Sequence, residues 1–149
     1  MRTVIAILLV GLLASCRKEA VLDPVPAITL VSAGPQQVLA FGEPVVLRFT
    51  YADGDGDLGT DDPDAYTLWV KDSRLGTADG YHIPPLAPPD AQVAIRGELE
   101  VELTPLFLLG NSGQEVMTYG FHITDRAGNR SNELTTTAIT VLADTAQVP

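Results

Sequence analysis

Apolar and polar residues alternate along most of the chain after residue 27, and this alternation is typical of β-strands that bury one face. The clearest stretch covers residues 93–103, where Arg96 and three glutamates alternate with mostly apolar residues. Helical periodicity is almost absent. The pattern predicts about seven strands, separated by segments rich in glycine, proline and aspartate. They lie at residues 28–33, 37–41, 45–51, 65–72, 93–103, 117–123 and 135–142.

The segment between residues 79 and 90 breaks this pattern with four prolines. Proline has no N–H to donate to a β-ladder, so we expect a connection or a broken edge strand there. In the strand predicted just before it, the alternation places Tyr66, Leu68 and Val70 on the inner face and Trp69 on the outer face.

Together these elements predict an all-β fold, a single antiparallel β-sandwich over residues 28–143 with a short tail at 144–149. The stretch from Tyr119 to Val141 resembles immunoglobulin-like and fibronectin type III-like modules, in which an aromatic-alternating strand leads into a D-x-x-G-N-x-S turn and a final strand. Residues 125–131 carry that turn here. The resemblance implies an immunoglobulin-like β-sandwich. The chain has a single cysteine, which excludes the disulfide that joins the sheets of antibody domains.

Residues 1–15 have a different character. Arg2 precedes an apolar run of about ten residues, too short to span a bilayer but of the length of a signal-peptide core. The run ends in Leu13-Ala14-Ser15-Cys16, which resembles the lipobox of bacterial lipoproteins. The resemblance implies cleavage before Cys16, a diacylglycerol group on its thiol and acylation of the new amine. The alternative is an ordinary secretory signal with an unrelated cysteine, but the only cysteine stands where a lipobox requires it.

A lipid anchor at Cys16 would decide where the protein resides. Several acyl chains hold a protein stably on a membrane, since each buried methylene contributes about 0.8 kcal/mol. Residues 16–27, which include two prolines, would then form a tether between the membrane and the domain. An aspartate after the cysteine resembles an inner-membrane retention signal, and Arg17 stands there instead. We therefore expect the cell envelope, on the outer membrane, with the side that the domain faces left open.

The chain is acidic, with 9 Lys and Arg against 19 Asp and Glu and a formal net charge of −10. This balance argues against nucleic-acid binding, which depends on basic patches. Besides the membrane, the partners that remain are another envelope protein or an extracellular glycan.

Acidic residues are densest in residues 53–64, which hold six aspartates among glycines. Crowded carboxylates repel one another unless a cation neutralises them, and hard oxygen ligands suit Ca²⁺, which takes six to eight of them. Asp53, Asp55 and Asp57 match the first ligand positions of an EF-hand loop, and Asp64 matches the twelfth. However, Leu58 replaces the glycine that an EF-hand requires, and the flanking segments have strand patterns. We therefore expect a calcium loop between strands.

A topological argument adds a ligand from elsewhere in the chain. In a sandwich of this type, the loop after the second strand and the turn before the last strand lie at the same end. Asp125 or a nearby carbonyl can therefore complete the site. The alternative is a solvated acidic turn, in which aspartates form Asx turns and glycines take positive φ. The predicted metal ligands are Asp53, Asp55, Asp57, Asp61, Asp64 and Asp125.

Signals for other activities are weaker. Trp69, if it faces outward, and Tyr81 could form an aromatic platform for a sugar, although Trp69 could equally pack beneath the proline-rich segment. His82 and His122 are not in a metal-ligand spacing, and no nucleophile elbow surrounds Ser112. The sequence favours a non-enzymatic, membrane-anchored domain, stabilised by calcium, for envelope structure or protein interaction. A glycan-binding accessory lipoprotein is the alternative, and a hydrolase is disfavoured.

Overall fold

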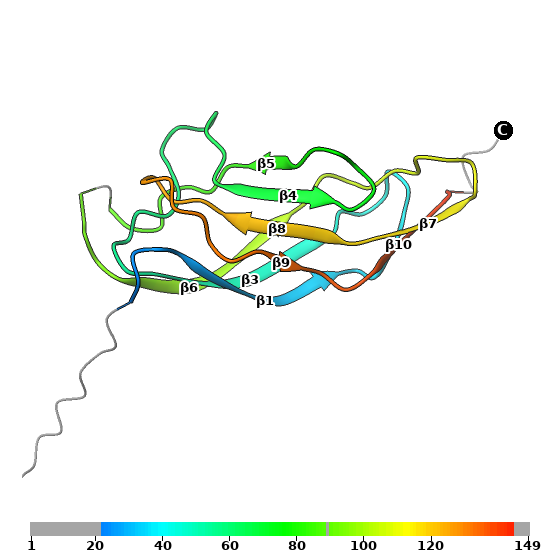
Figure 1. Cartoon of the computed structure of the whole chain (residues 1–149). Helices are drawn as coiled ribbons and strands as arrows, with labels where there is room; N and C mark the ends of the chain where they lie inside the picture. The colour runs from blue at the N-terminus through cyan, green and yellow to red at the C-terminus, as the bar shows by residue number, and fades with distance from the viewer. Residues whose placement is uncertain (1–21, 89, 145–149) are drawn as a thin grey trace, which may run out of the picture.

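The structure is a computed structural model that describes residues 22–88 and 90–144. The predicted signal peptide at residues 1–15, Cys16, the first part of the tether and most of the C-terminal tail lie outside these residues. The described residues form ten β-strands in three sheets, which confirms the all-β fold (Figure 1). They contain no helix long and apolar enough to cross a membrane.

Sheet A is antiparallel and has the strand order β1-β3-β6. In its central strand, Leu47 and Phe49 are fully buried while Arg48 faces solvent, as the alternation predicts. The outer face of the edge strand β6 is acidic, and Arg48 pairs there with Glu98 and Glu100. The strands of sheet A are β1 (Ala27–Gly34), β3 (Val46–Asp53) and β6 (Ile95–Glu102).

Sheet C is antiparallel as well and has the order β5-β4-β8-β9. Its inner face packs on sheet A, where the rings of Phe49 and Phe121 tilt by 51° with centroids 5.5 Å apart. Leu68, Val70 and Ile123 complete the same buried face, so the core lies between these two sheets. The strands of sheet C are β4 (Leu68–Asp72), β5 (Asp79–Tyr81), β8 (Tyr119–Ile123) and β9 (Leu134–Thr135).

Sheet B lies at one end of the molecule and has the order β2-β10-β7 (Figure 1). Its β2 and β10 run parallel, whereas β10 and β7 are antiparallel, so the expected antiparallel pairing holds for every strand pair of the described residues except β2 with β10. Its strands are β2 (Gln37–Leu39), β7 (Gln114–Met117) and β10 (Ile139–Leu142).

The number of strands exceeds the predicted seven by three. One of the three is β5, which lies in the proline-rich stretch where we expected a connection or a broken edge strand. The other two arise because two predicted strands are each divided between sheets B and C. The stretch 117–123 contains the last residue of β7 and all of β8, and the stretch 135–142 contains the last residue of β9 and all of β10. At the first break, the backbone N–H of Thr118 donates to the hydroxyl of Ser73, and that of Tyr119 donates to Thr136. Met117, Tyr119 and Phe121 keep one buried face across the break. Alternation therefore indicated the faces but not the change of partner strand.

Two further expectations differ from the structure. Tyr66 precedes β4 and is 50% exposed rather than on the inner face. The end of the predicted tether belongs to the domain, because Pro26 is buried and the carbonyls of Leu22 and Asp23 lie against Gly54.

The acidic loop after β3 and the turn after β8 lie at the same end of the molecule, next to the start of the described chain (Figure 1). A backbone hydrogen bond from Arg126 to the carbonyl of Asp57 joins them. This end positions the candidate site.

Candidate metal centre

Three carboxylates meet between the acidic loop and the turn after β8. Asp53 is the last residue of β3, Asp57 lies four residues further on, and Asp125 follows β8 by two residues. Each offers one oxygen, and these oxygens lie within 4.8 Å of one another. Two oxygens bound to one Ca²⁺ at 2.3–2.6 Å are at most about 5 Å apart. The spacing therefore fits ligands of a single ion.

The cluster contains carboxylate oxygens that the protein leaves unpaired. Asp53 is completely buried, and its Oδ2 accepts from the N–H of Asp57 at 3.0 Å. Its Oδ1, and Oδ1 of both Asp55 and Asp57, are buried without a hydrogen-bond partner among the described residues. An unsatisfied buried polar atom costs about 1–3 kcal/mol, more when the group is charged. A bound cation would remove this cost at several atoms at once.

The electrostatics of the cluster agree with this geometry. Burial, and then the charges of Asp55 and Asp57, raise the pKa of Asp53 to about 6. Burial, and then Asp125 and Asp55, raise the pKa of Asp57 as well. The protein's own cations compensate only in part. The charge of Arg126 acts to lower the pKa of Asp57, but the raising effects are larger. Arg126 itself donates to the carbonyl of Gly59 at 2.9 Å and forms no ion pair within the described chain.

Glycines shape the acidic loop by allowing other segments to approach it. Gly56 and Gly59 have φ of 75° and 78°, a region that favours glycine. A Cβ at Gly56 would lie 2.4 Å from the carbonyl oxygen of Val93, and one at Gly59 would lie 2.1 Å from that of Pro84. The loop is thus packed against the proline-rich connection at Gly59 and against the segment just before β6 at Gly56.

Asp125 is fixed by its own turn. Both of its carboxylate oxygens accept hydrogen bonds from Asn129, one from the backbone N–H at 2.7 Å and one from Nδ2 at 2.8 Å. Gly128, with φ of 90°, closes this turn. The alternative of a solvated acidic turn without an ion also predicts Asx-turn contacts of this kind. The same contacts orient Asp125 toward Asp57.

The structure brings together only part of the predicted ligand set. Asp53, Asp57 and Asp125 form the group, and Asp55 borders it with one buried oxygen. Asp61 and Asp64 are exposed and lie outside the group. The EF-hand spacing that singled out Asp64 applies to a loop between two helices, whereas this loop follows a strand.

The chemistry of this group is that of a hard-cation site. All donors are carboxylate oxygens, with neither the imidazole nor the thiolate that transition metals and zinc prefer. The cluster of Asp53, Asp57 and Asp125 can thus hold a metal ion.

The structure places the two residues of the predicted aromatic platform, Trp69 and Tyr81, on opposite faces of sheet C. In sheet C, Tyr81 lies opposite Leu68, and Trp69 lies opposite Gly80. Because opposite residues share a face, Tyr81 is on the core side, where its hydroxyl accepts from the N–H of Thr104. Trp69 is on the outer face, half-buried, and its neighbour there is Tyr66. The sequence missed this pair because Tyr66 was assigned to the strand and hence to the inner face.

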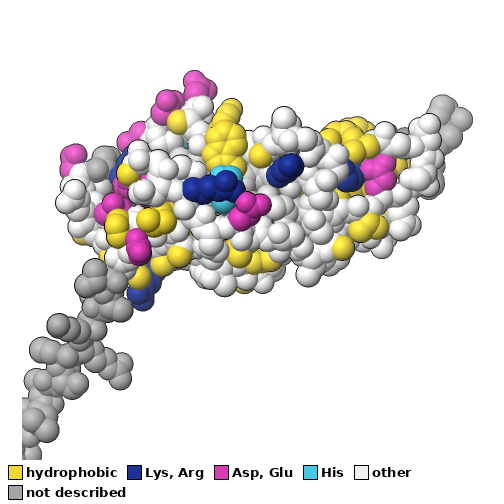
Figure 2. Space-filling view, viewed as in Figure 1, with side chains coloured by type: hydrophobic (Ala, Val, Ile, Leu, Met, Phe, Trp, Pro, Cys, Tyr) yellow, Lys and Arg dark blue, Asp and Glu magenta, His cyan; other side chains and the backbone are white. Residues whose placement is uncertain are grey.

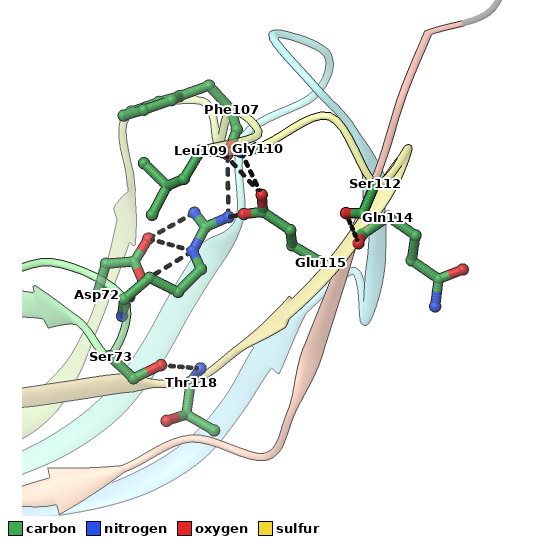
Figure 3. Close-up of polar contacts among 10 residues, drawn as sticks. Asp72, Ser73, Phe107, Leu109, Gly110, Ser112, Gln114, Glu115 and Thr118 are labelled. Atoms are coloured by element: carbon green, nitrogen blue, oxygen red, sulfur yellow. Dashed lines mark hydrogen bonds and ion pairs between the residues drawn. The ribbon is translucent and has the colours of Figure 1, made fainter.

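A second polar cluster at the opposite end was also missed, because Phe107 and Glu115 are far from Arg74 in the sequence. Arg74 bonds to both oxygens of Asp72, pairs with Glu115 at 2.6 Å, and donates to the carbonyl of Phe107 (Figure 3). Glu115 in turn accepts from the N–H groups of Leu109 and Gly110. These charges are mutually satisfied and hold the loop between β6 and β7, so the cluster is structural.

Comparison of the chain with models of protein families, with characterised proteins and with solved structures finds no significant match.

Proposed function

We propose that this chain is the precursor of a bacterial lipoprotein, anchored through Cys16, whose immunoglobulin-like β-sandwich is non-enzymatic and binds Ca²⁺. The ion bridges Asp53, Asp57 and Asp125 and so fastens the acidic loop to the turn after β8. The domain serves envelope structure or protein interaction at the outer membrane.

One observation carries the calcium proposal: oxygens of Asp53 and Asp57 are buried and unpaired beside Asp125. A solvated acidic turn would expose such oxygens to water. Three or four carboxylates, completed by carbonyls or water, can supply the six to eight ligands that Ca²⁺ takes in flexible geometry. Mg²⁺ requires a nearly ideal octahedron of ligands and fits such a group less well.

The anchor rests on the sequence. The lipobox-like Leu13-Ala14-Ser15-Cys16 follows a signal-like apolar run and holds the only cysteine. A domain without disulfides depends on packing and bound ions for stability, which supports a role for calcium as a staple.

Thermal unfolding of the full chain in mild detergent, with calcium and with chelator, tests the proposal. A ligand that binds only the native state must stabilise it, by about 2.7 kcal/mol at a concentration one hundred times Kd. We expect the midpoint to rise by several degrees in millimolar calcium. An unchanged midpoint contradicts the calcium site, while the anchor is tested separately by lipid labelling.

A further inference from the structure

The outer face of sheet C carries a row of aromatic and charged side chains that belong neither to the metal centre nor to the cluster around Arg74. Trp69 of β4 lies opposite His122 of β8, and Tyr66 reaches the same face over β5. Arg130 and Glu133 follow beyond His122, and both charges affect its pKa. We define the aromatic row as Tyr66, Trp69, Lys71, His122, Arg130 and Glu133. Figure 2 shows hydrophobic side chains above a histidine that is flanked by cationic and acidic groups.

Tyr66 packs over Gly80 of β5. Gly80 has no side chain, and a Cβ there would lie 2.5 Å from Cδ2 and 2.6 Å from Cγ of Tyr66. The ring therefore occupies the space above Gly80, and it meets Trp69 at 6.3 Å with an interplanar angle of 90°. Half of Tyr66 remains exposed. Such a ring offers a fixed, exposed face whose ordering cost is already met in the free protein.

The polar members of the row have bonding capacity to spare. Lys71, exposed two residues after Trp69, forms no ion pair within the described chain. Arg130 and Glu133 pair with each other and remain more than half exposed. Burial, and then Arg130, lower the pKa of His122, which keeps its ring neutral and able to donate and to accept at pH 7. The row crosses four strands, or about 14 Å.

We propose that this face binds an oligosaccharide that carries carboxylate groups, with a sugar ring on Tyr66 and carboxylates at Lys71 and Arg130. Sugar rings stack on fixed aromatic faces, and His, Arg and Glu side chains give directed hydrogen bonds to hydroxyls. Asp62 and Asp64 are exposed just before Tyr66, so the anionic groups of the ligand belong at the Lys71 end. A protein partner is disfavoured, because two aromatic rings among charges supply too little apolar surface for a stable interface.

The chain reports on this site directly, because Trp69 is its only tryptophan. Full-length protein in mild detergent and calcium is titrated with oligogalacturonate, alginate fragments and hyaluronan fragments, and with neutral maltotriose. We expect at least one acidic oligosaccharide to shift the Trp69 emission saturably and more strongly than maltotriose. Tyr66→Ala and Lys71→Glu should each weaken binding by about tenfold, which corresponds to 1.4 kcal/mol.

Two further variants test whether the oligosaccharide binds on this face of sheet C. Gly80→Ala should displace the Tyr66 ring and act like Tyr66→Ala. Arg48→Glu reverses a positive charge, as Lys71→Glu does, but on the outer face of sheet A, and it should leave the affinity unchanged. Absence of a response to every acidic oligosaccharide at millimolar concentration overturns the proposal. Binding that persists unchanged in Tyr66→Ala and Lys71→Glu also overturns the proposal. That result is expected if calcium alone bridges the protein and the oligosaccharide.

Discussion

Oδ2 of Asp57 accepts a hydrogen bond of 3.0 Å from the backbone N–H of Ala127, 70 residues further along the chain. The carbonyl of Asp57 accepts a second bond from Arg126 at 3.2 Å. One residue thus joins the loop after β3 to the turn after β8, while its Oδ1 stays unpaired. Ion binding would tighten a junction that the backbone already forms.

This junction predicts which aspartates respond to calcium. Asp57→Asn keeps a hydrogen-bond acceptor but removes the ligand charge, so we expect the calcium-dependent rise in midpoint to disappear. The matched control is Asp61→Asn, an exposed carboxylate of the same loop, which should keep the full rise. Thermal unfolding with calcium and with chelator measures both. If both variants lose the calcium-dependent rise equally, calcium acts by screening the charges of the whole loop and not by binding at a defined site.

The raised pKa of Asp53 predicts how the stability of the ion-free protein depends on pH. Its folded-state pKa is about 6 against an ordinary 3.8. The folded state therefore binds this proton more tightly than the unfolded state does. The resulting stabilisation is complete below about pH 3.8 and is lost as the pH rises through 6. The loss amounts to about 3 kcal/mol, since a tenfold change in proton affinity is 1.36 kcal/mol.

Asp53→Asn isolates this effect, because the variant cannot carry the buried charge. In chelator at pH 7.5 we expect the variant to be more stable than the wild type, and the difference to shrink as the pH falls to 4.5. Urea unfolding at each pH gives the free energies of unfolding. A difference that stays constant with pH would show that Asp53 does not titrate in this range.

The lipid anchor makes a prediction that does not depend on calcium. Cells that express the full chain should incorporate a labelled fatty acid into it, and Cys16→Ala should abolish the label because the thiol is the acceptor. Ser15→Thr, which keeps Cys16, serves as the control and should retain labelling. Label that persists in Cys16→Ala would place the acyl group elsewhere and remove the anchor.

The sequence predicted the strands and faces better than the pairing. Alternation is a local property, so Leu68 and Val70 were placed on the inner face correctly. The change of sheet at Thr118 depends on hydroxyls of Ser73 and Thr136, which are distant in the sequence. No local pattern encodes such contacts.

The candidate site divides in the same way. Charge density located the acidic loop, and the topology expected for a sandwich indicated Asp125, which the structure places beside Asp53 and Asp57. Charge density also included Asp61, and the EF-hand spacing added Asp64; both are exposed and lie outside the group. Tyr66 was missed because its position depends on the absence of a side chain at Gly80 across the strand.

The buried ion pairs of Arg74 predict a large loss of stability at the end opposite the metal centre. The side chain of Arg74 is only 10% exposed, and that of Asp72 is 5% exposed. Arg74→Ala leaves two carboxylates without their cation, which costs about 3–5 kcal/mol for a buried pair. Arg130→Ala breaks an exposed pair with Glu133 and should cost less than about 1 kcal/mol. Chemical denaturation compares them, and similar losses would show that the Arg74 cluster is effectively solvated.

Three glycines predict a graded series that tests how tightly the acidic loop is packed. Gly59 has a positive φ and touches the Pro84 carbonyl, Gly113 has a positive φ of 74° in open space, and Gly76 has open space alone. Alanine at Gly76 restricts only the unfolded chain and should be neutral or stabilising by up to about 1 kcal/mol. Alanine at Gly113 adds backbone strain of about 1–2 kcal/mol.

Alanine at Gly59 adds a clash to the same strain, so it should destabilise the protein the most and also weaken the calcium-dependent rise in midpoint. Only Gly59→Ala should affect calcium binding, because Gly113 and Gly76 lie outside the acidic loop. If the calcium-dependent rise in midpoint is unchanged in Gly59→Ala, contact with the proline-rich connection does not shape the metal centre.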